Sequence, residues 1–195
     1  MQEDRLERQL AFIVEIDKLK RVLRQTLLAD ESRQENSAEH SWHLALMAGL
    51  LAEYAPEGVD VARVVRMVLV HDLVEIDAGD AFCYDPVAVT GKAEREQACA
   101  DRLFALLPPD QGSEFRELWD EFEARSTPDG RFANALDRLQ PLLQNLNTRG
   151  GTWRMHGVAR EQVARRMEPI REAVPELWPL VESVLDRATA EGWVS

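Results

Sequence analysis

Cysteine, glycine, proline and long apolar runs are all scarce in this sequence, and each scarcity excludes a class of protein. Its 195 residues include 2 cysteines, 10 glycines and 9 prolines, too few for a disulfide scaffold, a collagen or a low-complexity chain. The longest apolar run, 44–52, is far shorter than the roughly 18 residues of a membrane span. The first residues are charged and do not resemble a signal peptide. We therefore predict a cytoplasmic protein with no membrane partner.

Positive charge is also in short supply. The sequence has 23 Lys and Arg against 35 Asp and Glu, a net charge of −12. Such a surface repels nucleic-acid backbones, so we expect no nucleic-acid partner. A small anionic substrate could bind only where arginines or a metal cation reverse the local sign.

The residues that are present predict helices. Apolar residues recur at three- and four-residue spacing, and no segment alternates with the period of two that marks a half-buried strand. Asn36 and Glu39 have the spacing of a capping box. We expect a single all-α domain over 1–195, with a loop at 78–91. The expected helices are about 6–28, 37–55, 61–76, 92–107, 112–125, 130–147, 160 onward and 175–192.

Only four histidines occur, and one of them is followed directly by an aspartate. His71 and Asp72 lie near the end of the most apolar expected helix, where burying both is costly unless they are paired or bind a cation. Glu75 is one helical turn further on and shares their face. Asp80 follows Gly79, where the chain can turn back toward the same place.

Two more residues could complete a metal site. His40 lies one turn into another expected helix, and Asp137 lies among apolar residues of the 130–147 helix. Two imidazoles and two carboxylates suit manganese, iron, cobalt or zinc. Water bound to such an ion has a lowered pKa and becomes a nucleophile at neutral pH.

The order of these residues is similar to that of a known family. His40, His71-Asp72 and Asp137 resemble the H…HD…D signature of the HD-domain metal-dependent phosphohydrolases. The strings ENSAEHSW at 35–42 and HDLVE at 71–75, with Gly79-Asp80, resemble its 5′-deoxynucleotidase branch. The resemblance covers about 19–147, and further helices follow at about 158–192. It implies a single HD-domain helical bundle.

The resemblance also implies an activity, namely hydrolysis of deoxynucleoside 5′-monophosphates to nucleoside and phosphate. Four residues would hold the metal: His40, His71, Asp72 and Asp137. Glu75 would orient or activate the attacking water. Asp80 would assist the leaving oxygen or hold a second cation, such as magnesium. The family also forms homodimers, for which Trp153, Trp178 and Trp193 offer apolar surface.

Two arginines are the expected phosphate ligands. Arg33 matches an arginine of the family's R-x-E-N-x-x-E-H string, and Arg24 follows Leu19-Lys20 as the family's other arginine does. In the family a tryptophan comes next and helps to sense the sugar, whereas this chain has Gln25 and one additional residue before His40. This departure from the family pattern leaves two points open. One is whether the protein distinguishes deoxyribose from ribose, and the other is whether its substrate is a different phosphoester.

Several residues have simpler interpretations. We expect His43 not to be a ligand and His156, in a loop-like segment, to be a surface or interface residue. We expect Trp42 and Met47 to be core residues and Cys83 not to be a nucleophile. The absence of histidine from 73 to 136 counts against a dinuclear phosphodiesterase. The alternatives are an HD hydrolase of another small phosphoester or nucleoside polyphosphate, and a nucleotide-binding regulator without turnover.

Overall fold

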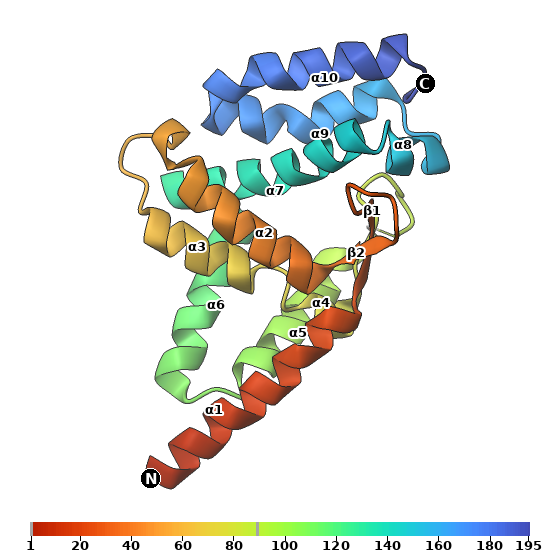
Figure 1. Cartoon of the computed structure of the whole chain (residues 1–195). Coiled ribbons are helices and arrows are strands. Elements are labelled where there is room, and N and C mark those ends of the chain that lie inside the picture. Colours follow the sequence, from red (N-terminus) through yellow and green to blue (C-terminus); the bar gives the residue numbers. More distant parts are fainter. Residues whose placement is uncertain (1, 89) are drawn as a thin grey trace.

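Helices form nearly all of the chain in the computed structural model, which describes residues 2–88 and 90–195. The predicted all-α class is confirmed, with one small sheet added (Figure 1). The helices are α1 Gln2–Ile16, α2 Ser37–Leu50, α3 Val61–Val70, α4 Glu75–Ala78, α5 Lys92–Phe104, α6 Pro109–Ala124, α7 Pro128–Asn147, α8 Gly151–His156, α9 Arg160–Ala173 and α10 Trp178–Ala190. Three short 3₁₀ helices are η1 Asp17–Arg21, η2 Ala52–Tyr54 and η3 Pro175–Leu177. Within the described residues, no helix has the length and hydrophobicity of a membrane span.

The expected helix over 6–28 is wrong beyond Ile16. The chain continues as η1 and then as strand β1, Leu23–Leu27, which pairs antiparallel with β2, Gln34–Asn36. This sheet also corrects the expectation that no strand occurs. Its backbone groups are satisfied across the pair, an interaction that helical periodicity within one segment does not reveal. The register is irregular between Leu23 and Leu27, as in a β-bulge, which redirects side chains.

The start of α2 follows from its first residues. The Asn36 side chain accepts a hydrogen bond from the Glu39 amide at 2.9 Å, and a Glu39 carboxylate oxygen accepts one from the Asn36 amide at 3.1 Å. The predicted capping box is therefore confirmed. Because the cap sets the first residue of α2 at Ser37, His40 lies in the first turn.

The expected helix over 61–76 is interrupted where the chemistry begins. Asp60 caps α3 by accepting from the amides of Ala62 and Arg63, but α3 ends at Val70 and a turn at 71–74 precedes α4. At this end the His71 ring donates from Nδ1 to the Val68 carbonyl at 2.8 Å. The side chain thus satisfies a carbonyl that the end of the helix leaves free.

Helix α7 is the centre of the packing. It contacts α2, α3, α6 and α9, and α10 covers the far side of α9 (Figure 1). Fully buried side chains from these helices include Leu44, Val64, Leu136 and Ile170. Met47 is buried as predicted, whereas Trp42 is 61% exposed and is not a core residue. Helix α2 therefore has one buried face and one apolar exposed face.

Candidate metal centre

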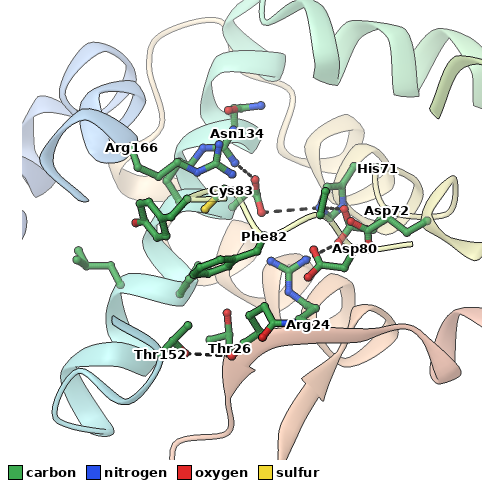
Figure 2. Close-up of a pocket in the computed structure, with 18 of the residues that line it drawn as sticks. Arg24, Thr26, His71, Asp72, Asp80, Phe82, Cys83, Asn134, Thr152 and Arg166 are labelled. Carbon is green, nitrogen blue, oxygen red and sulfur yellow. Dashed lines mark hydrogen bonds and ion pairs between the residues drawn. The ribbon is translucent and has the colours of Figure 1, made fainter. Parts of the chain in front are cut away.

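Four of the predicted residues meet between three elements. His40 comes from α2, His71 and Asp72 follow α3, and Asp137 comes from the middle of α7, with all four side chains buried. The distance from His40 Nε2 to Asp137 Oδ1 is 2.9 Å, and that from His71 Nε2 to Asp72 Oδ1 is 3.0 Å. His71 Nε2 lies 3.8 Å from the same Asp137 oxygen, and Figure 2 shows His71 and Asp72 side by side at this place. One ligand atom from each of His40, His71 and Asp72 can be chosen within 4.8 Å of the others.

These separations suit a single ion. Metal–ligand bonds of about 2.1 Å at right angles separate neighbouring ligand atoms by about 3 Å. The shortest gaps of 2.9 and 3.0 Å match that spacing. The sequence order of the residues gave no distances, so this convergence is new information from the fold.

His71 presents a free lone pair to the centre. Its Nδ1 carries the hydrogen, because that nitrogen contacts the Val68 carbonyl, which can only accept. Nε2 is then an acceptor, and it is buried without a hydrogen-bond partner among the described residues. A buried polar atom without a partner is costly, and a cation at the centre would remove that cost.

His40 is held in the same form by a relay of side chains. Gln140 donates from Nε2 to Glu35 Oε1 at 2.6 Å, so its carbonyl oxygen faces His40 Nδ1 at 3.1 Å. Reversing the amide would set its oxygen against the Glu35 carboxylate. Nδ1 of His40 therefore donates, and its Nε2 lone pair faces the Asp137 carboxylate. Burial and the nearby charge of Arg24 lower the pKa of His40 to about 4, so the ring is neutral at neutral pH.

The residues therefore fit a divalent ion. Two imidazole Nε2 atoms and two carboxylates converge on one buried point, where unpaired acceptors would repel one another. Imidazole with carboxylate is the donor set of manganese, iron, cobalt and zinc sites. The side chain of His43 instead accepts a 3.3 Å hydrogen bond from Gln140 Nε2.

Two further carboxyl groups line the same cavity. Glu75 is buried at the start of α4, where its Oε2 accepts a 2.7 Å hydrogen bond from Ser37 Oγ. Burial and the neighbouring Asp72 carboxylate raise the pKa of Glu75 well above its usual range. Burial also raises the pKa of Asp80, although Arg24 opposes the shift. Both groups thus hold protons more tightly than exposed carboxylates do.

The two predicted phosphate ligands separate. Arg24 lines the cavity from β1 and donates from Nη1 to Asp72 Oδ2 at 2.9 Å. Arg33 lies outside the cavity, where its half-exposed guanidinium makes two hydrogen bonds to the Glu39 carboxylate. In this structure the donors of Arg33 are engaged at the start of α2, away from the cavity, and a role for Arg33 in binding phosphate stays a prediction.

The cavity, about 310 Å³ in volume, is lined by side chains that the motifs did not single out. Among them are Phe82, Tyr84, Lys92, Arg138, Thr152 and Arg166. No spacing in the sequence could have selected them, because they come from a loop and four helices. Gln25 lines the cavity too, at the position where the family's tryptophan is expected.

The structure also places the remaining residues of the sequence analysis. His156 ends helix α8 instead of lying in a loop, and its exposed ring is 4.3 Å from that of Phe82. Trp153 and Trp193 are buried, which corrects the expectation that they offer a dimer surface. Cys83 and Cys99 are both free.

Known proteins are similar to this chain over most of its length. The sequence model of the HD domain matches residues 16–178. The chain is 32% identical to 5′-deoxynucleotidase HDDC2 of Homo sapiens over 136 residues, which are 69% of this chain and 65% of that protein. It is 29% identical to 5′-deoxynucleotidase YGK1 of Saccharomyces cerevisiae over 70% of this chain and 64% of that protein. The match thus spans slightly less than two thirds of these relatives.

A solved structure is similar over the whole chain. It is a predicted metal-dependent phosphohydrolase from Magnetospirillum magnetotacticum, 55% identical, with a TM-score of 0.96 over 100% of this chain and 98% of that one. Sequence and fold therefore agree on the family. The chain belongs to the HD domain family.

Proposed function

We propose that this protein is a metal-dependent phosphohydrolase that converts deoxynucleoside 5′-monophosphates to nucleosides and phosphate. The observation that carries the proposal is the buried convergence of two imidazole Nε2 lone pairs with two carboxylates beside an open cavity. Relatives named 5′-deoxynucleotidase support the substrate class.

The four ligands of the ion are His40, His71, Asp72 and Asp137. When bound, a divalent ion would polarise a phosphoryl oxygen and lower the pKa of a coordinated water. Manganese, cobalt, iron and zinc all suit this donor set, so the physiological ion is a matter for metal analysis. The alternative role for Asp80 is to hold a second cation, such as magnesium.

The cavity carboxyls divide the proton transfers between them. The Ser37 hydroxyl holds one oxygen of Glu75, which orients the other to accept a proton from the attacking water. Asp80, with its raised pKa, suits the transfer of a proton to the departing 5′ oxygen. Arg24 stays cationic because the Asp72, Glu75 and Asp80 carboxylates outweigh the effect of burial on its pKa, and it offers donors to the phosphate.

The test is phosphate release from a panel of deoxy- and ribonucleoside 5′-monophosphates. The chelated protein would be assayed with manganese, cobalt, iron, zinc or magnesium added singly, and Glu75→Gln would serve as the matched low-turnover control. Metal-dependent release from deoxy substrates supports the proposal, and the deoxy-to-ribo ratio reports what Gln25 does. No release from folded, metal-loaded protein would overturn it.

The same assay addresses the two competing functions. A hydrolase of another small phosphoester or of nucleoside polyphosphates would release phosphate from those compounds and not from monophosphates. A nucleotide-binding regulator would bind monophosphates without turnover. The presence of Glu75 and Asp80 in the cavity favours turnover, because binding alone needs neither.

We also propose that the chain acts as one domain and forms a homodimer in the cytoplasm. Support for one domain comes from the family match over 16–178 and from α8 and α9, which pack on α7. Support for self-association comes from an apolar stripe on α1 that is about half exposed, namely Leu6, Leu10 and Ile13. Two free cysteines suit a reducing compartment. Light scattering of the wild type and of Leu10→Glu would test the dimer, since a monomeric wild type would contradict it.

A further inference from the structure

A second group of arginines lines the cavity, on the side away from Arg24. Arg138 comes from α7, one residue after Asp137, and Arg166 comes from α9. Figure 2 shows Arg24 and Arg166 approaching the cavity from opposite sides, with the loop residue Cys83 beside Arg166. Neither Arg138 nor Arg166 belongs to a motif, so their position in the cavity is a result of the fold alone.

Arg138 lies immediately outside the metal centre. Its Nη1 is hydrogen-bonded to Oδ2 of Asp137, while Oδ1 of the same carboxylate faces the two imidazoles. Arg24 has the equivalent contact with Asp72 Oδ2. Each carboxylate of the centre therefore has one oxygen toward the ion position and one toward an arginine, and the two guanidiniums flank the centre.

Arg166 has no anionic partner of its own. Among residues 2–88 and 90–195, no carboxylate oxygen lies within 4.0 Å of its guanidinium, and no side-chain hydrogen bond involves it. Arg138 is only 12% exposed, and the Asp137 carboxylate is its ion-pair partner. Arg166 therefore brings a second positive charge to this side of the cavity, with no carboxylate beside it.

Arg138 is paired with Asp137, whereas Arg166 adds a positive charge without an acidic partner of its own, in a chain whose net charge is −12. Like charges in a poorly solvated cavity repel, so an anion that contacts both guanidiniums would be favoured there. The planar guanidinium suits phosphate in particular, because its donors match two oxygens at once. Two such groups from different helices can hold a tetrahedral dianion from one side.

We propose that Arg138 and Arg166 form a second phosphate-binding arm, which holds the 5′-phosphate of the substrate from the side opposite Arg24. The inference rests on the proposed phosphohydrolase function. It assigns to α7 and α9 the role that the sequence had suggested for Arg33. Charge that develops on the phosphoryl oxygens during transfer would be stabilised by both arms.

The test compares Arg166→Gln with Arg165→Gln, a change at the neighbouring exposed position of α9. Inorganic phosphate is the probe, titrated into metal-loaded protein by calorimetry. We expect Arg166→Gln to weaken phosphate binding by about tenfold or more, since one charge-assisted contact is lost. Arg165→Gln should bind as the wild type does. Metal content should be unchanged in both variants, because neither side chain touches a ligand of the ion.

Further measurements separate this proposal from its alternatives. Arg166→Lys should recover part of the phosphate affinity, since it restores charge but not the planar fork. If Arg166 instead contacts the base, phosphate binding stays unchanged and KM varies with base identity, which would overturn the proposal. Phosphate affinity equal in Arg166→Gln and wild type also overturns it while leaving turnover intact. Failure of the proposed function would appear separately, as absence of turnover in the wild type.

Discussion

At the scale of single residues, the chemistry depends on which ring nitrogen of each histidine carries the hydrogen. A backbone carbonyl determines this for His71 and the Gln140 amide determines it for His40. In both rings Nε2 is left as an acceptor directed at the same point. The burial that lowers the pKa of His40 keeps this acceptor free of a proton, which is the form that binds metal.

Removing a ligand and removing the proposed base should have different effects. His71→Ala should weaken metal affinity by more than the roughly 10–100-fold that loss of an outer partner costs, and activity should disappear with the metal. Glu75→Ala should retain the metal and lower kcat by about 10²–10⁴-fold. Metal analysis by mass spectrometry alongside steady-state kinetics measures both. A Glu75→Ala protein with the wild-type rate would show that its assigned role is wrong.

The two arginines of the motif should differ as their positions do. Arg24→Ala removes a cavity donor and should raise KM for nucleotide by about tenfold or more. Arg33→Ala breaks a half-exposed pair with Glu39 at the start of α2, so it should leave KM unchanged and cost less than about 1 kcal/mol of stability. Kinetics and urea denaturation of the two variants provide the comparison. An equal rise in KM for both would contradict the structure.

At the scale of elements, the centre is positioned by what surrounds its ligands. Glu35 at the middle of β2 accepts from both Gln140 and Gln144, which are one turn apart on α7. Burial raises the pKa of Glu35 against the pull of Arg24 and these two amides. The short strand therefore orients a helix residue, Gln140, that in turn orients His40. A two-strand sheet in an all-α protein has this specific consequence.

Breaking that relay should weaken the site without removing a ligand. Gln140→Leu leaves His40 Nδ1 without its acceptor, so we expect metal affinity to fall by about 10–100-fold. Gln144→Leu is the matched control, because it loses the same contact to Glu35 and keeps the one to His40. Competition with a chelator of known affinity measures the difference. Equal losses in the two variants would mean that the relay does not act through His40.

At the scale of the whole molecule, the C-terminal segment packs against the chain just after the end of α7. Gly150 has a φ of +72°, and a Cβ built there would lie 2.4 Å from the Cβ of Trp193. The ring of Trp193 is buried, with the guanidinium of Arg187 over it. Residues far apart in sequence thus meet beside α8, whose Thr152 side chain donates to the backbone of Gln25 in β1 and lines the cavity.

This contact predicts unequal effects for two glycines. Gly150→Ala should destabilise the protein by about 1–3 kcal/mol more than Gly157→Ala, since only the former meets a close neighbour. Gly157 has a φ of +59° and nothing within 4 Å of its built Cβ. Alanine at this position would therefore suffer the backbone strain of a positive φ but no steric contact. Urea denaturation of both variants measures the free energies of unfolding. Equal losses would show that the Trp193 packing yields easily.

How much could be predicted from the sequence depends on the range of each interaction. The cap at Asn36 was predictable because its partner is three residues away. The four residues that meet at the centre were predictable from the order of their residue types and the family resemblance. Strand β1 was not, because the helical spacing of 6–28 continued through it and its partner lies beyond a turn. Trp42 was misplaced because apolar spacing predicts a face but not what covers it.

By itself, the sequence determined that this chain is helical, acidic and equipped with two imidazoles and two carboxylates in the order of an HD domain. Only the tertiary structure decided that Gln140 orients His40 across 100 residues, that Arg33 lies outside the cavity and that Arg138 and Arg166 lie within it. The physical reason is that local patterns encode hydrogen bonds and faces within one element. Which polar groups share a cavity depends on how several helices pack, and no single segment carries that information.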